Sequence, residues 1–276
     1  MSEKSDIYFA AVGDVHGNIY TMLGLLQSWS QKHQKELSFV LQVGDFEAHR
    51  HAQDLLSMDA PTKYKTLGDF ADFYTEKAYF PYPLWFIGGN HESYGWLDMF
   101  PQGKEIAINF NYLGRVNSID LAGLKIVGVS GIYKPELFAA NKRPSAAEIE
   151  KYSNKKYISF LESEIAQAID YDRADILLLH DWPAGIISPE ALKIFQQRYS
   201  NARYQEIGNE YARLLVEALQ PKLVLCGHLH FKYRYCLSLS PEINSNICCL
   251  ANVQQGKDSL AVFRLTSESE IIEVVD

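Results

Sequence analysis

Five short apolar runs along this chain each stop abruptly at a cluster of Asp, Asn or His residues. Each run is rich in β-branched and aromatic residues and has the length of a strand buried on both faces. The runs and the polar residues after them are Ile7–Val12 before Asp14 and His16, Phe39–Val43 before Asp45, Leu84–Ile87 before Asn90 and His91, Ile176–Leu179 before His180 and Asp181, and Leu223–Cys226 before His228 and His230. Open α/β sheets bind ligands just outside the carboxyl ends of their strands. The pattern therefore predicts an α/β fold in which five strand ends build one site.

The segments between and after these runs predict how the chain is organised. Apolar residues at helical spacing predict the helices Tyr20–Trp29, Tyr157–Ile169 and Ile207–Leu219. A hairpin is expected at 117–129, and the later runs read as antiparallel strands at Tyr233–Leu239, Asn246–Val253, Leu260–Leu265 and Ile271–Val274. Strand–helix units followed by strands indicate two packed mixed sheets flanked by helices, in one domain over residues 1–276. A division near residue 115 is the alternative.

Composition restricts the class of protein. The chain has 276 residues with 47% hydrophobic and 22% charged, which excludes a disordered or fibrous chain. Its 26 basic and 34 acidic residues give a net charge of −8, which argues against non-specific nucleic-acid binding but leaves room for a local basic groove. No run approaches the ~18 apolar residues of a membrane span. A polar N-terminus and four cysteines without a C-x-x-C pair favour the cytoplasm, or the nucleus in a eukaryotic host.

The residue types at the strand ends are those of a metal site. Five of the eight histidines lie there, and imidazole with carboxylate oxygen suits Mn, Fe and Zn. The candidate ligands are Asp14, His16, Asp45, Asn90, His180, His228 and His230. Seven ligands are too many for one tetrahedral ion and suit two divalent ions, with Asp45 as the bridge. Such a centre lowers the pKa of a bridging water, so that hydroxide can attack phosphorus in line.

The five motifs together resemble those of the calcineurin-like metallophosphoesterases. The resemblance implies a four-layer αββα sandwich with a dinuclear metal centre. It implies one metal on Asp14, His16, Asp45 and His230, and the other on Asp45, Asn90, His180 and His228. It also implies that His91 assists the leaving group. The residues themselves agree, since His91 is next to a ligand, with Glu92 expected to orient it. Asp181 is expected to orient His180.

A narrower resemblance is to the RNA lariat debranching enzymes, which cleave the 2′–5′ phosphodiester at an intron branch point. It covers about residues 6–235 and rests on segments 44–50, 61–64, 86–92, 112–114, 130–134 and the His180-Asp181-Trp182-Pro183 stretch. Two departures stand out. Those enzymes usually carry Cys where Asp14 stands, and this chain ends soon after His230 without their C-terminal extension. Asp14 favours two metals and loosens the assignment of the substrate.

The segment 133–157 is predicted to be a substrate-recognition insertion. Six cations against three carboxylates give it a local charge of +3, and aromatic residues lie between them. Bases stack on aromatics while cations hold phosphates, so single-stranded or branched RNA fits. The expected contacts are Tyr133, Lys134, Lys142 and Arg143, with Arg50 as a further phosphate contact. A solvated helix face with core aromatics is the structural alternative for this segment.

Three functions remain open from the sequence. The first is a phosphodiesterase acting on branched RNA. The second is a phosphodiesterase or phosphatase acting on small nucleotides or other phosphate esters, which the acidic balance and Asp14 favour. Against protein phosphatases, Glu47-Ala48-His49 stands where their Asp-Arg-Gly is expected. The third is a non-catalytic scaffold that binds a partner protein, which the complete ligand set disfavours. No obligate protein partner is inferred.

Overall fold

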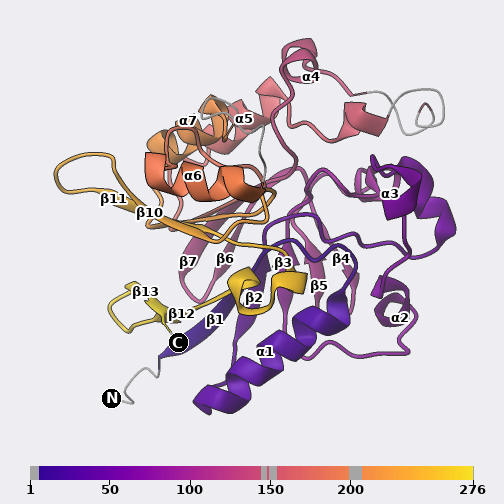
Figure 1. Ribbon diagram of the computed structural model, residues 1–276, viewed down its shortest axis with the longest axis horizontal. Coiled ribbons are helices and arrows are strands. Elements are labelled where there is room, and N and C mark those ends of the chain that lie inside the picture. Colours follow the sequence, from indigo (N-terminus) through magenta and orange to yellow (C-terminus); the bar gives the residue numbers. More distant parts are fainter. Residues whose placement is uncertain (1–5, 144–147, 149–153, 199–206, 276) are drawn as a thin grey trace.

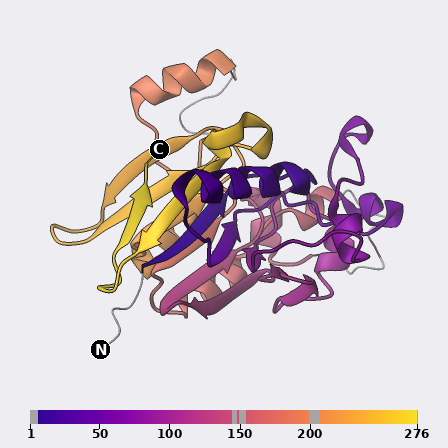
Figure 2. The same cartoon turned by 90° about the horizontal axis from the view of Figure 1, so that it is seen from below.

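Two mixed β-sheets lie face to face with helices on both outer sides (Figures 1 and 2). The structure is a computed structural model that describes residues 6–143, 148, 154–198 and 207–275. The predicted α/β fold with two mixed sheets flanked by helices is confirmed.

The first sheet has seven strands, in the order β13 (Ile271–Val274), β12 (Leu260–Leu265), β1 (Ile7–Val12), β2 (Phe39–Gln42), β3 (Leu84–Phe86), β5 (Phe110–Tyr112) and β4 (Lys104–Ala107). Strands β1, β2, β3 and β5 run parallel to one another. Antiparallel strands close both edges of the sheet. The carboxyl ends of β1, β2 and β3 therefore meet at one edge.

The second sheet has six strands, in the order β10 (Tyr233–Ser238), β11 (Asn244–Cys249), β9 (Leu223–Cys226), β8 (Ile176–Leu179), β7 (Leu124–Val129) and β6 (Val116–Leu121). Strands β7, β8, β9 and β11 are parallel, and β6 and β10 are antiparallel at the edges. The polar residues after β8 and β9 thus share one end of this sheet.

Alternating side chains divide the apolar core into layers. On β1, Phe9 and Ala11 belong to the core between the sheets, whereas Ala10 and Val12 pack under α1 (Ile19–His33). Alternate residues of β8 divide in the same way, with Leu177 and Leu179 under α5 (Glu162–Ile169) and α7 (Glu210–Leu219). Successive strand residues point to opposite faces, so each buried strand serves two cores. The result is the four-layer order helix, sheet, sheet, helix (Figure 1).

Shorter helices complete the described part of the chain. They are α2 (Phe70–Tyr74), α3 (Tyr94–Leu97), α4 (Pro135–Ala140) and α6 (Pro189–Arg198), with short 3₁₀ segments at η1 (Ala52–Ser57), η2 (Thr62–Tyr64), η4 (Asn154–Tyr157) and η6 (Val253–Ser259). Among the described residues, none of the helices combines the length and apolar character that crossing a bilayer requires.

Two predicted elements were wrong in detail. The helix predicted from Tyr157 begins at Glu162, because Leu161 is extended and its backbone N–H donates to Oε2 of Glu164 at 2.8 Å, which starts the helix there. The closing strands are not all antiparallel. After β10 the chain returns so that β11 pairs parallel with β9, and the strand predicted to reach Val253 ends at Cys249.

The chain passes from the first sheet to the second between Tyr112 and Val116, at the alternative boundary near residue 115. Both sheets nevertheless contribute to one core, in which Phe39 and Leu41 pack with Ile126 and Leu178. A single domain over the chain stays a prediction, and this shared core supports it.

Candidate metal centre

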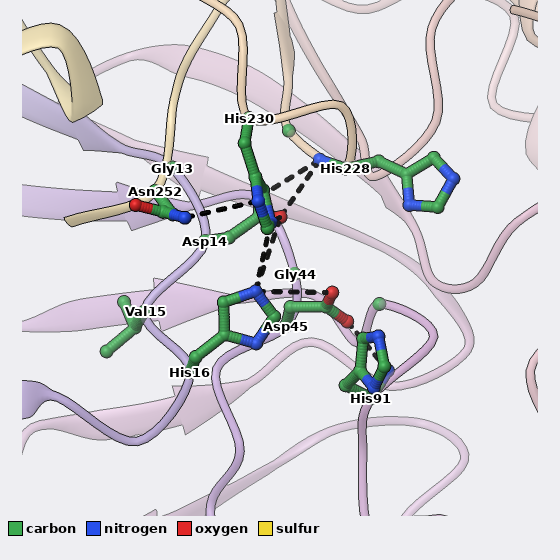
Figure 3. A network of polar contacts seen from close by, with 12 residues as sticks. Gly13, Asp14, Val15, His16, Gly44, Asp45, His91, His228, His230 and Asn252 are labelled. Atoms are coloured by element: carbon green, nitrogen blue, oxygen red, sulfur yellow. Dashed lines mark hydrogen bonds and ion pairs between the residues drawn. The ribbon is translucent and has the colours of Figure 1, made fainter. Parts of the chain in front are cut away.

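The loops that follow β1, β2, β3, β8 and β9 bring their polar side chains together at the junction of the two sheets (Figure 3). Glycines make this approach possible. A Cβ on Gly89 would overlap Oδ1 of Asp45, and a Cβ on Gly227 would overlap Oδ1 of Asp14. Gly89, which begins the Gly-Asn-His-Glu motif, therefore leaves room for the carboxylate of Asp45. Gly227, which begins the Gly-His-x-His motif, leaves room for that of Asp14.

Four of the predicted ligands have left-handed backbones. The φ angles of His16, Asp45, His228 and His230 are 46°, 51°, 67° and 49°. Side chains other than glycine adopt this conformation at a cost of order 1–3 kcal/mol each, and such residues cluster at functional sites. The fold therefore maintains strained turns in order to aim these side chains at one point.

One group of ligand atoms is formed by Asp14, His16 and His230. Oδ2 of Asp14 lies 2.9 Å from Nε2 of His230. Nε2 of His16 lies 3.0 Å from Nε2 of His230 and 3.9 Å from Oδ2 of Asp14. Figure 3 shows the side chains of Asp14 and His16, from the loop after β1, facing His230 from the loop after β9. Three ligand atoms this close together can bind one ion.

A second group is formed by Asp14, Asp45 and His180. Oδ2 of Asp45 lies 3.4 Å from Nε2 of His180 and 3.9 Å from Nε2 of His16, so it faces a histidine of each group. Asn90 joins through its Oδ1, 3.1 Å from Nε2 of His180. The ring of His228 lies 5.0 Å from that of His180, between ring centroids. The arrangement thus offers ligands to two ions, with both carboxylates between them.

The charges of the site favour cations. Asp14 and Asp45 are buried, at 0% and 1% exposure. Burial alone would lower the pKa of His16, but the hydrogen bond that its ring donates to Glu47 and the charges of both aspartates raise it to about 9. Burial also lowers the pKa of His180, but the charge of Asp45 and its hydrogen bond to the ring outweigh that effect and raise the pKa to about 10. A buried negative cluster surrounded by imidazoles is the donor set that divalent ions require, so the residues present fit such ions.

The histidines are oriented by partners that the sequence did not reveal. Nδ1 of His16 lies 2.9 Å from Oε1 of Glu47. Nδ1 of His180 lies 2.8 Å from the carbonyl oxygen of Val43. Nδ1 of His230 lies 3.1 Å from the side-chain amide of Asn252. Glu47 could have been noticed two residues after Asp45, but nothing in the sequence around Asn252 distinguishes it from an ordinary turn residue.

The expected role of Glu92 was wrong. Both of its oxygens accept backbone N–H groups, from Phe46 at 2.7 Å and from Glu47 at 3.0 Å, so the carboxylate does not orient His91. Burial and the charge of Asp45 raise the pKa of Glu92 to about 8, against the effect of those hydrogen bonds. Glu92 instead fastens the loop after β2 to the loop after β3.

The expected role of Asp181 was also wrong. Its Oδ1 accepts the backbone N–H of Trp182 and its Oδ2 accepts the side-chain amide of Asn209, both at 2.8 Å, while His180 is oriented by Val43. The indole of Trp182 is fully buried and donates to the carbonyl oxygen of Gly227 at 2.8 Å. The His-Asp-Trp-Pro stretch therefore supports the turn that carries His228.

His91 lies at the wall of an open cleft beside the metal centre. Its ring centroid is 5.5 Å from that of His16, and its backbone N–H donates to Oδ1 of Asp45 at 2.7 Å. The cleft has a volume of about 680 Å³, and its lining includes His16, His230, Glu47, Lys63 and Asn252. His91 is thus fixed at its backbone and open to the cleft at its ring.

The predicted substrate contacts lie outside the lining of this cleft. Arg50 is held by Asp54, with Nη2 2.8 Å from Oδ1, and stacks on Trp96. Arg143 is held by Glu164, with Nη2 2.6 Å from Oε2. The guanidinium of each arginine is therefore engaged in the fold, because an adjacent carboxylate pairs with it.

Of the other three predicted substrate contacts, one side chain is packed in the fold and two are exposed to solvent. Tyr133 packs against Tyr211, with ring centroids 5.0 Å apart, whereas Lys134 and Lys142 are exposed. The predicted cation Lys151 and the aromatic Tyr152 lie outside the described residues.

Comparison with known proteins gives a consistent result. A family model described as calcineurin-like phosphoesterase matches residues 7–232. The chain is 35% identical to a lariat debranching enzyme of Entamoeba histolytica, over 84% of this chain and 66% of that one. It is 32% identical to that of Saccharomyces cerevisiae, over 81% of this chain and 57% of the other. The chain thus spans between about half and two thirds of these curated relatives. A solved crystal structure with 11% identity superposes with a TM-score of 0.58, covering 98% of this chain and 99% of that one, which supports the fold.

Proposed function

Because this chain belongs to the calcineurin-like phosphoesterase family, we propose that it hydrolyses a phosphodiester at the Asp14–Asp45 centre, with branched RNA as substrate. The observation that carries the proposal is the position of His91. This ring is open to a cleft whose wall also contains His16 and His230, two candidate ligands of one ion. A scaffold protein has no need of such an arrangement.

The proposed centre holds two divalent ions, Mn or Fe by preference and Zn as an alternative. Asp14, His16, Asp45 and His230 would hold the first, and Asp45, Asn90, His180 and His228 the second. Bound there, divalent ions supply a water of lowered pKa and positive charge for the phosphate oxygens. The ligand atoms of Asp14, His16 and His230 lie within 4.8 Å of one another, as do those of Asp14, Asp45 and His180, which supports two neighbouring ions. The places of Asn90 and His228, and the choice of Asp45 as the bridge, rest on the resemblance of the motifs.

His91 would act as the proton donor to the leaving oxygen. A general acid must reach the departing oxygen while its own backbone stays fixed, and the hydrogen bond from its N–H to Asp45 provides that support. Glu92 contributes indirectly, since it holds the backbone at Phe46 and Glu47 beside the site.

The choice of RNA rests on the debranching enzymes among the relatives and on the segment 133–157, whose exposed Lys134 and Lys142 remain candidates for phosphate contacts. A small nucleotide diester is the second candidate. The cleft volume of about 680 Å³ is that of a site for a small ligand, and the buried Glu47 in its wall disfavours a long polyanion. A cytoplasmic or nuclear location stays a prediction, to be tested by imaging a tagged chain.

The proposal is tested with Mn²⁺-loaded protein and three substrates at equal concentration. These are a 2′–5′ branched oligoribonucleotide, its linear 3′–5′ counterpart and bis-p-nitrophenyl phosphate, with His91→Ala as the control. Preference for the branch supports the debranching activity. Cleavage of bis-p-nitrophenyl phosphate alone would support the hydrolytic centre and exclude RNA as the substrate. Cleavage of none of the three by metal-loaded protein would overturn the proposal.

A further inference from the structure

We infer that two side chains outside the predicted ligand set, Glu47 and Asn252, decide which ring nitrogen two of the histidines present to a metal ion. They are positioning residues, Glu47 for His16 and Asn252 for His230. The inference rests on the proposed metal centre, and it concerns how one of its two ions is held.

A neutral imidazole has one N–H and one lone pair. A histidine that binds a metal through Nε2 must therefore carry its proton on Nδ1, and a hydrogen-bond acceptor beside Nδ1 fixes that tautomer and the ring plane. For His180 the acceptor is the backbone carbonyl of Val43, at 2.8 Å. A main-chain acceptor is supplied by the fold itself and cannot be removed by a change of side chain.

For His16 the acceptor is the carboxylate of Glu47. Its Oε1 lies 2.9 Å from Nδ1, and the side chain is buried at 3% exposure. Its Oε2 lies 3.8 Å from Nε2 of the buried His49, an ion-pair contact that is too long for a hydrogen bond. The backbone N–H of Glu47 donates to Glu92 at 3.0 Å, which holds the main chain at this position. The buried carboxylate of Glu47 thus faces the ring of His16.

For His230 the partner is the amide of Asn252, whose Nδ2 lies 3.1 Å from Nδ1 of the ring. Figure 3 shows this contact as a dashed line. In this orientation Oδ1 of Asn252 is buried and has no hydrogen-bond partner among the described residues. The two ends of an amide have nearly the same shape, so the hydrogen-bond network must decide between them. Turning the amide places Oδ1 beside Nδ1, where it accepts the proton that a metal-binding His230 must carry there.

The two ions are then held differently. The first depends on two side-chain acceptors, at Glu47 and Asn252. For the second, the acceptor beside His180 is a backbone carbonyl. Losing an outer hydrogen bond of this kind costs about 10–100-fold in metal affinity. Substitutions at Glu47 or Asn252 should therefore weaken one ion and spare the other.

The experiment titrates the full chain with Mn²⁺ by calorimetry, which gives both affinity and stoichiometry. The variants are Glu47→Ala, Asn252→Leu and Asn252→Asp, and Glu217→Ala is a charge-matched control on the exposed face of α7. Asn252→Ala replaces the leucine variant should that one fail to fold. In the Zn²⁺-loaded wild type, ¹⁵N imidazole shifts report directly which nitrogen of each ring is protonated.

Glu47→Ala and Asn252→Leu are each expected to weaken one of two ions by about 10–100-fold, because neither new side chain has an acceptor for the Nδ1 proton. Asn252→Asp retains wild-type affinity because a carboxylate also accepts from Nδ1. Equal loss in Asn252→Asp and Asn252→Leu would overturn the inference for Asn252, since the amide would then be a donor. Wild-type affinity in Glu47→Ala and Asn252→Leu would overturn it for both residues. If the wild type itself binds no Mn²⁺, the proposed function fails instead.

Discussion

Nε2 of His16 lies 3.0 Å from Nε2 of His230, although 214 positions separate the two residues in the chain. Oδ2 of Asp14 is near both nitrogens, at 3.9 Å and 2.9 Å. Two lone pairs would repel at this distance, so the space between the nitrogens suits a proton on His16 or a metal cation. Protonation of His16 and metal binding therefore compete for the same position.

Metal binding is expected to release about two protons per chain at pH 8. The pKa of His16 is about 9 and that of His180 is about 10, so both rings are protonated at pH 8 without metal, whereas a ligand must be neutral. Calorimetric titration with Mn²⁺ in buffers of different ionisation enthalpy gives the number released. A release near zero would contradict the assignment of these histidines as ligands.

The same shifts predict how the stability of metal-free protein depends on pH. Both pKa values lie above the ordinary value of 6.5, so the two histidines stabilise the fold fully below pH 6.5. They lose that contribution as pH rises through about 9 and then about 10. Thermal unfolding of EDTA-treated protein between pH 7 and 10 should show a falling melting temperature. A melting temperature that rises over this range would contradict the prediction.

Asp45→Asn is expected to lose metal and activity together. Oδ2 of Asp45 faces His16 and His180. Removing its charge should weaken metal binding by several kcal/mol. Turnover should fall by ~1000-fold or more as the metals are lost. Metal content by mass spectrometry and the rate on a diester measure both effects. Asp120→Asn, on the exposed edge strand β6, is the matched control and should change neither.

His91→Ala is expected to keep its metals and lose ~100-fold or more in turnover, as the loss of a general acid usually does. The ring faces the cleft, and the backbone N–H of His91 donates to Asp45 through a hydrogen bond that alanine retains. Metal analysis and steady-state kinetics on one preparation separate the two effects. A metal-free His91→Ala protein would show that His91 holds the ions instead.

Glu92→Gln is expected to lower the free energy of unfolding by about 1–3 kcal/mol, because an amide N–H₂ would then face a backbone N–H. The residue is fully buried between the N–H groups of Phe46 and Glu47. Chemical denaturation measures the loss. If Glu92 acted on His91, the variant would instead resemble His91→Ala in its kinetics while keeping wild-type stability.

The sequence predicts which residues gather at this site better than it predicts their hydrogen-bond partners. Asp14, Asp45 and His180 could be found because each follows an apolar run whose end marks the end of a buried strand. The parallel order of the strands then brings these ends together. Glu92 could not be assigned, since its direction depends on the turn after β3. Asn252 was missed because it becomes a partner of His230 only when η6 folds against the loop after β9.

The arginines show the same limit. Arg50 and Arg143 are typical phosphate contacts by residue type, yet Asp54 and Glu164 pair with them in the fold. Which carboxylate lies beside a given arginine depends on how the segments pack against one another. The pairing therefore cannot be predicted from the sequence alone.

The placement of β1 between β2 and β12 has a consequence for synthesis on the ribosome. Strand β1 acquires its second neighbour only after Leu260–Leu265 has been translated, and His16 meets its partner only after His230 has been translated. A growing chain therefore has no complete centre until most of its length has emerged.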